Sequence, residues 1–77
     1  MRIAVAGAGA FGTGLAIALA ANGAVTLWAR DDAAATQMQT TRENAARLPG
    51  HILPEQITVT SDIDDFFAAE TILLAIP

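Results

Sequence analysis

The residues whose spacing best fits a binding function are the three glycines of the segment Gly7-Ala8-Gly9-Ala10-Phe11-Gly12. The G-x-G-x-x-G spacing is typical of a turn between a strand and a helix that lets the backbone approach a phosphate closely. The motif alone is a weak signal. Here an apolar run precedes it, an alanine- and leucine-rich run follows it, and another strand-like run comes soon afterwards. We therefore expect a turn that binds the pyrophosphate of a dinucleotide.

Each glycine of the turn has its own expected role. Gly7 permits the tight turn off the strand, Gly9 removes a Cβ from the path of the pyrophosphate, and Gly12 lets the helix pack close to the sheet. The helix that starts near Ala10 would direct unpaired N–H groups and its positive dipole end at the phosphates. Gly14, inside that helix, costs about 0.8–1 kcal/mol relative to Ala, and close packing is the explanation we favour for it.

A second group of candidate residues, Trp28-Ala29-Arg30-Asp31-Asp32, follows the next strand-like run. In dinucleotide sites an acid at this point binds the ribose 2′-hydroxyl of NAD, whereas an Arg accommodates the 2′-phosphate of NADP. Arg30 can pair with a phosphate and lie across an adenine ring. Asp31 would repel a 2′-phosphate, but it serves equally well as a carboxylate at the next helix N-terminus. The sequence favours NADP, with NAD accepted as well.

No catalytic residue or metal ligand is predicted within these residues. His51, the single histidine, lies in a Pro/Gly-rich stretch with no acid placed beside it, and a solvated loop position is expected. Trp28 is expected to pack on the sheet. Arg42 and Glu43 are interpreted as a solvated helix face.

Hydrophobic patterns predict the elements that position the glycine turn. Short apolar runs predict strands over residues 2–6, 25–29, 57–60 and 71–76. A helix is predicted over residues 10–21, closed by Asn22-Gly23. The spacing of Ser61 to Asp64 matches a capping box, which would open a short helix through Phe66 and Phe67.

A longer helix is predicted between the second and third strands. It begins at Asp31 and Asp32 and runs to about Ala46. Pro49-Gly50 and Pro54 are expected to bracket a loop. The expected buried face of this helix carries Met38, Thr41, Ala45 and Leu48.

The resulting β-α-β-α-β-α-β order predicts the α/β class, a Rossmann-type parallel sheet with helices on both faces. In the dinucleotide-binding arrangement the strands lie in the order 3-2-1-4. The fourth strand is apolar throughout, and full burial is predicted for it. Further strands would have to follow it. We therefore expect residues 1–77 to be the N-terminal part of a dinucleotide-binding domain, with the rest of that domain and a substrate domain absent.

Composition narrows the class of protein. Eight acids against four basic residues give a net charge of −4, which argues against a nucleic-acid-binding surface. There is no cysteine for a disulfide framework, which is compatible with a reducing cytoplasmic location. The apolar runs are too short to span a bilayer, and no signal-peptide cleavage pattern is present. A cytoplasmic protein is expected.

Several stretches resemble bacterial NAD(P)-dependent glycerol-3-phosphate dehydrogenases, and the resemblance extends over essentially the whole chain. The stretches are residues 7–13, 22–23, 27–30, 44–50 and 60–62. The Asn-x-x-x-Leu-Pro pattern at Asn44, Leu48 and Pro49 is the more discriminating part, because many dehydrogenases share the glycine turn. The closing residues 74–77 resemble the fourth strand of that family, which leads into a loop near the nicotinamide.

The resemblance implies an enzyme that interconverts glycerol 3-phosphate and dihydroxyacetone phosphate, a small phosphorylated three-carbon substrate, for phospholipid synthesis. It implies cofactor contacts at Ala10, Phe11, Arg30 and Arg47. It places the catalytic lysines and substrate ligands beyond Pro77, so the chain alone is expected to be inactive. A homodimer is compatible with the full-length enzyme.

The sequence departs from the pattern of the family at three positions. Ala10 replaces a common serine but keeps the backbone N–H, Arg47 stands where an aromatic residue is frequent, and Asp31 stands where a basic residue is sometimes found. Two alternatives remain open. One is another NADP-dependent Rossmann dehydrogenase, such as ketopantoate reductase or a 6-phosphogluconate-type enzyme. The other is a stand-alone nucleotide-sensing module without catalysis.

Overall fold

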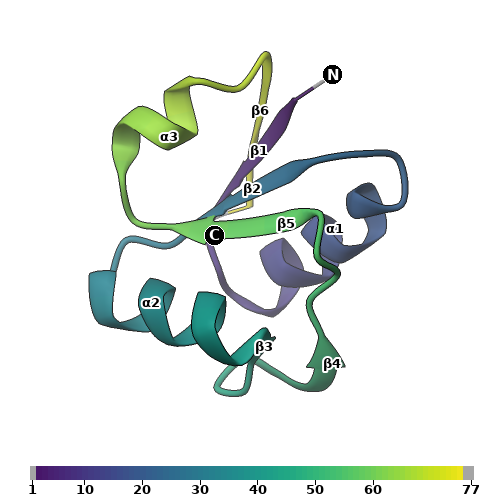
Figure 1. Cartoon of the computed structure of the whole chain (residues 1–77), viewed down its shortest axis with the longest axis vertical. Coiled ribbons are helices and arrows are strands. Elements are labelled where there is room, and N and C mark those ends of the chain that lie inside the picture. Colours follow the sequence, from purple (N-terminus) through teal and green to yellow (C-terminus); the bar gives the residue numbers. More distant parts are fainter. Residues whose placement is uncertain (1, 76–77) are drawn as a thin grey trace.

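A computed structural model describes residues 2–75 and arranges them as a four-stranded parallel sheet between helices, with a small hairpin beside it (Figure 1). The sheet has the order β5-β2-β1-β6, which confirms the predicted 3-2-1-4 arrangement. The elements in chain order are β1 (Ile3–Ala6), α1 (Ala10–Ala20), β2 (Val25–Trp28), α2 (Asp32–Thr41), β3 (Glu43–Asn44), β4 (Leu48–Ile52), β5 (Ile57–Thr60), α3 (Ile63–Phe67) and β6 (Thr71–Leu74).

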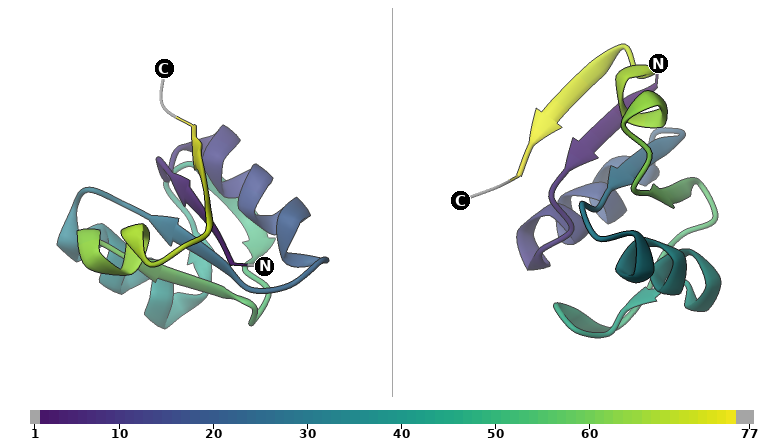
Figure 2. Two further views of the ribbon diagram at one scale, coloured as in Figure 1. Left: turned by 90° about the horizontal axis from the view of Figure 1, so that it is seen from above. Right: turned by 90° about the vertical axis from the view of Figure 1, so that its left-hand side faces the viewer.

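The parallel register brings the carboxyl ends of the strands to one edge of the sheet. Ala6 at the end of β1 lies opposite Trp28 in β2 and opposite Leu74 in β6. Figure 2 shows β1 and β6 side by side with their arrows pointing the same way. The glycine turn, Arg30 and Ala75 therefore all leave the sheet at the same edge, where ligands bind in open α/β sheets.

Each face of the sheet has its own core. Val5 and Leu27 point to the face that α1 and α2 cover, whereas Ala4 and Ala6 pack with Phe66 of α3 on the opposite face. Figure 1 shows α3 on the other side of the sheet from α1 and α2. Right-handed crossovers explain this division, because the chain moves outward from β1 to β5 and then returns past β1 to β6.

The second helix is shorter than predicted. α2 ends at Thr41, and Arg42 adopts a left-handed conformation (φ 61°) while its N–H donates to the Met38 carbonyl at 2.8 Å. The predicted extension to Ala46 is therefore wrong, and Ala45 and Leu48 lie outside the helix. The chain continues instead into the antiparallel pair of β3 and β4. The loop predicted between Pro49-Gly50 and Pro54 is in part strand β4.

Tertiary hydrogen bonds at Arg42 explain this early end of α2. Its guanidinium donates to the carbonyl oxygens of Pro54 and Ile57, each at 2.7 Å, and to the Gln39 side chain at 2.9 Å. These bonds offset the cost of the left-handed backbone. Arg42 and Glu43 are both partly buried, so their interpretation as a solvated helix face is wrong.

The start of α3 differs from the predicted capping box by one residue. Asp62, not Ser61, is the N-cap, and its carboxylate accepts a hydrogen bond from the Asp64 N–H at 2.9 Å. The Ser61 hydroxyl donates instead to Asp32 at 2.8 Å. The helix itself, through Phe66 and Phe67, is confirmed.

Two expectations about packing are wrong. A Cβ at Gly14 would meet no atom within 4 Å outside its own helix, so close packing does not explain that glycine. β6 is not fully buried, because Ile72 and Leu74 are 37% and 70% exposed. The strand lies at the edge of the sheet, while α3 packs over β1 and β2. Residue 76 of the predicted strand lies outside the described residues.

Candidate functional site

The glycine turn is held in place by its own backbone. Gly7 has φ 113°, a conformation that glycine adopts far more readily than other residues. Its N–H donates to the Trp28 carbonyl at 3.0 Å, which ties the turn to the end of β2. A Cβ on Gly12 would overlap the carbonyl oxygen of Gly7 and lie 3.2 Å from the Cβ of Ala75. The tight start of α1 therefore requires glycine at positions 7 and 12.

Gly9 differs from these two glycines. It is the N-cap of α1 with φ −75° and ψ −173°, an extended conformation open to any residue, and a Cβ there would meet nothing within 4 Å. Neither the backbone nor the surrounding protein requires a glycine. No side chain caps α1, and no acid lies in its first turn. The N–H groups at this helix end are thus available to an external acceptor.

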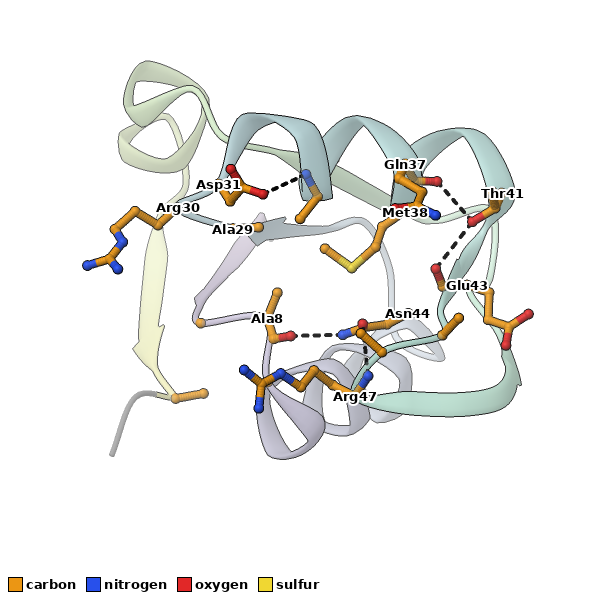
Figure 3. Close-up of a pocket in the computed structure, with 16 residues that line it drawn as sticks. Ala8, Ala29, Arg30, Asp31, Gln37, Met38, Thr41, Glu43, Asn44 and Arg47 are labelled. Atoms are coloured by element: carbon orange, nitrogen blue, oxygen red, sulfur yellow. Dashed lines mark hydrogen bonds between the residues drawn. The ribbon is translucent and has the colours of Figure 1, made fainter.

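A pocket of about 960 Å³ opens at this edge of the sheet (Figure 3). It extends from the glycine turn across the end of β2 to α2 and the β3–β4 hairpin, and Ala75 lines it after β6. Its size is at the upper end of the range of small-molecule sites. The lining residues are Gly7, Ala8, Gly9, Ala29, Arg30, Asp31, Ala34, Gln37, Met38, Thr41, Glu43, Asn44, Ala45, Ala46, Arg47 and Ala75.

Arg30 and Asp31 lie at one side of this pocket with different surroundings. Arg30 is exposed, and its side chain extends away from the centre of the pocket (Figure 3). Asp31 is the N-cap of α2, and its carboxylate accepts a hydrogen bond from the Ala34 N–H at 3.1 Å. The charge of Asp31 is therefore engaged by the helix, while the guanidinium of Arg30 faces solvent.

Other predicted site residues occupy two different places. Arg47 lines the pocket from the hairpin, and its side chain extends toward the side where Ala8 lies (Figure 3). Ala10 and Phe11 begin α1 and do not line the pocket. Phe11 is 73% exposed. The structure thus brings Gly7, Gly9, Arg30 and Arg47 around one cavity and leaves the first residues of α1 at its margin.

Sequence reasoning did not identify Asn44 as a site residue. It is buried, lines the pocket, and bonds to the glycine turn and to α1. Its only signal in the sequence is its place in the Asn-x-x-x-Leu-Pro pattern. Spacing along the chain could not indicate its partners, because they lie 36 and 31 residues away.

His51 and Trp28, which are expected to play no part in chemistry, are not among the residues that line the pocket. His51 is exposed in β4. Trp28 is partly buried, donates from its indole nitrogen to the Ser61 carbonyl at 3.1 Å, and lies 5.9 Å from the Phe66 ring. The expectation that Trp28 packs on the sheet is confirmed.

Comparison with known proteins places this architecture in one family. The model of the NAD-dependent glycerol-3-phosphate dehydrogenase N-terminus matches residues 2–77. The chain belongs to this family. The expected family is thereby confirmed, and with it a nicotinamide dinucleotide, NAD or NADP, as the cofactor class. The ketopantoate reductase and 6-phosphogluconate-type alternatives are not favoured.

Individual relatives agree with this assignment. The chain is 53% identical over 77 residues to a glycerol-3-phosphate dehydrogenase (NAD(P)+) of Roseobacter denitrificans, covering 100% of this chain and 24% of the relative. It is 51% identical to glycerol-3-phosphate dehydrogenase (NAD(P)+) 2 of Mycobacterium tuberculosis, covering 97% and 23%.

A solved structure shows the same fold. The crystal structure of glycerol-3-phosphate dehydrogenase from Coxiella burnetii superposes with a TM-score of 0.89 at 33% identity, covering 95% of this chain and 23% of that one. The predicted α/β class is confirmed. The chain spans about a quarter of the length of the relatives it matches. Within residues 2–75, no helix has the length and apolar character needed to cross a membrane.

Proposed function

We propose that residues 1–77 form the N-terminal part of the cofactor-binding domain of an NAD(P)-dependent sn-glycerol-3-phosphate dehydrogenase. The remainder of that domain and the substrate domain would belong to a longer polypeptide. Family membership supports this proposal, as do relatives of which the chain covers 24%. The full-length protein would interconvert glycerol 3-phosphate and dihydroxyacetone phosphate in the cytoplasm, where it would supply phospholipid synthesis.

The observation that carries the proposal is the open approach to Gly9. Its conformation and its surroundings would both accept a side chain, yet the position is glycine. Gly9 is the N-cap residue of α1, and no side chain bonds to the N–H groups at this helix end. A pyrophosphate that approaches this backbone explains the absence of a Cβ. The side chains or backbone of Gly7, Gly9, Ala10, Phe11, Gly12, Arg30 and Arg47 are the proposed cofactor contacts.

The residues of this chain bind and orient the cofactor. When bound, the nicotinamide supplies hydride exchange with C2 of the substrate. The N–H groups at the start of α1 would hold the pyrophosphate, and Arg30 would face the ribose of the adenosine half. Catalytic lysines and the ligands of the substrate phosphate are proposed to lie beyond residue 77. This chain alone would then bind cofactor weakly and catalyse nothing.

We infer a preference for NADP with NAD accepted. Arg30 is exposed at the pocket and free to meet a 2′-phosphate, while the carboxylate of Asp31 is engaged as the N-cap of α2. An engaged carboxylate repels a 2′-phosphate less than one directed at it, because the helix N-terminus partly compensates its charge. A homodimer of the full-length enzyme remains a prediction.

The test is turnover by the purified full-length enzyme. We expect oxidation of NADPH, and more slowly of NADH, when dihydroxyacetone phosphate is added. Ketopantoate with NADPH and 6-phosphogluconate with NADP+ serve as comparison substrates. Activity on either of these, with none on dihydroxyacetone phosphate, would contradict the proposed substrate.

A further inference from the structure

Asn44 connects three parts of the site that are distant in sequence. Its side chain is 4% exposed. The Nδ2 group donates to the carbonyl oxygen of Ala8 and to the Thr13 hydroxyl, each at 2.8 Å. Its Oδ1 accepts from the backbone N–H of Arg47 at 3.3 Å. One buried amide thus joins the glycine turn, α1 and the loop that carries Arg47.

The chemistry of these partners requires a carboxamide. A peptide carbonyl such as that of Ala8 can only accept, and a peptide N–H such as that of Arg47 can only donate. The group between them must therefore present a donor on one branch and an acceptor on the other. Asn does so, whereas an ionised Asp of the same shape has no donor. The orientation of the amide follows from the same two partners.

The bond to Ala8 also determines where the next N–H points. In a trans peptide the C=O and N–H lie in one plane and point in opposite directions. Since the Ala8 carbonyl is turned toward Asn44 in β3 (Figure 3), the N–H of Gly9 in the same peptide unit points away from β3. No acceptor within residues 2–75 is bonded to that N–H. Gly9 itself lines the pocket, and a Cβ on it would meet no protein atom within 4 Å.

We propose that Asn44 is the positioning residue of the phosphate-binding turn. It holds the Ala8–Gly9 peptide so that the Gly9 N–H is presented to the pyrophosphate, and it anchors the backbone from which Arg47 enters the pocket. The Nδ2 group of Asn44 already donates to Ala8 and Thr13, so Asn44 acts on the cofactor through the turn. The inference rests on the proposed function only in taking the ligand to be a nicotinamide dinucleotide.

The test uses Asn44→Asp in the full-length enzyme, with equilibrium binding of NADPH and NADH as the readout. The variant keeps the shape of the side chain and removes the donor to Ala8. We expect Kd to rise by about tenfold or more, the effect of leaving one buried hydrogen-bonding group unpaired. Because both cofactors share the pyrophosphate, Kd should rise by the same factor for each. The KM for the cofactor should rise, whereas kcat, which is measured at saturating cofactor, should change much less.

Arg42→Met is the matched control for a general loss of stability. Arg42 also joins the β3–β4 region to the rest of the fold, through the carbonyls of Pro54 and Ile57, but it makes no bond to the glycine turn. It should lower the midpoint of thermal unfolding without changing either Kd. If Asn44→Asp does not fold, Asn44→Ala removes the bonds to Ala8, Thr13 and Arg47 without adding a charge, and the same parallel rise in Kd is expected.

Three results would overturn the positioning role. They are an unchanged Kd in a folded Asn44 variant, an equal rise in Arg42→Met of similar stability, and a rise for one cofactor only. A wild-type enzyme that binds NADPH but does not reduce dihydroxyacetone phosphate would refute the proposed substrate alone. Normal wild-type turnover with unimpaired binding by the Asn44 variants would refute the positioning role alone.

Discussion

At the scale of single residues, the glycines of one turn are required for different reasons. Gly12 is required by the protein, since a Cβ would overlap the Gly7 carbonyl oxygen. Gly9 is not, because its conformation is ordinary and its surroundings are empty. This difference separates a structural glycine from one whose small size serves a ligand, and it can be tested with a single added methyl group.

Gly9→Ala is expected to leave the fold intact and weaken cofactor binding. At a φ that Ala adopts without strain, the change should stabilise the protein by about 0.4–1 kcal/mol. Gly12→Ala should instead destabilise it by about 1–3 kcal/mol through overpacking. Urea unfolding measures both changes in stability, and NADPH titration measures the loss of cofactor binding in Gly9→Ala. Gly14→Ala, a helical position with free space, serves as the control that should bind normally. Unimpaired binding by Gly9→Ala would refute the role of Gly9.

Arg30→Ala is expected to separate the two cofactors. Loss of a charge-assisted contact to a 2′-phosphate should cost about 1.5–3 kcal/mol for NADPH, while NADH, which lacks that phosphate, should lose little. The ratio of KM values for NADPH and NADH in the full-length enzyme measures this. An equal increase for both would show that Arg30 contacts the adenine or supports the structure.

The sequence alone was sufficient for residues whose role depends on near neighbours. The turn at Gly7 and the place of Arg30 just after β2 follow from local pattern and strand ends. Asn44 could not be assigned in this way, because its function depends on partners that only the folded chain brings within hydrogen-bonding distance.

At the scale of elements, local propensity gave the positions of strands and helices but not all of their ends. Residues 42–46 continue a helical pattern in composition, yet α2 stops at Thr41. The cause is the set of hydrogen bonds from Arg42 to Pro54 and Ile57, which lie beyond the hairpin. Tertiary bonds of this kind override weak helix propensity, and no local pattern reports them.

The N-terminus of α3 provides a test at this scale. Asp62→Ala should destabilise the full-length protein by about 0.5–2 kcal/mol, because it removes the carboxylate that caps the helix. Ser61→Ala removes only an exposed bond to Asp32, so a smaller effect is expected. Chemical denaturation of both variants measures the difference. A larger loss of unfolding free energy in Ser61→Ala than in Asp62→Ala would instead support the predicted capping box, in which Ser61 is the N-cap.

At the scale of the whole molecule, the strand order was predictable and the burial of β6 was not. Alternating strands and helices with right-handed crossovers leave few arrangements, and the dinucleotide-binding one is observed. The burial of a strand depends on elements at both sides. β6 pairs with β1 on one side, and within residues 2–75 no strand pairs with its other edge.

A polypeptide of residues 1–77 alone is expected to self-associate through β6. An apolar edge strand offers unpaired backbone groups to a second copy, and Leu74 is 70% exposed there. Leu74→Lys should reduce the association seen by sedimentation velocity. Ile52→Lys changes an equally exposed residue, at 69%, on the β3–β4 hairpin. The same reduction in both variants would argue against the edge of β6.

The two cores on opposite faces of the sheet also determine the order in which the fold can be completed as the chain leaves the ribosome. Every buried member of the α1/α2 core lies between Val5 and Val59, whereas the opposite core needs Phe66. The pairing of β1 is completed last, because its second partner strand, β6, begins only at Thr71. During vectorial synthesis, the face that α1 and α2 cover therefore has all its buried core residues before the opposite face does.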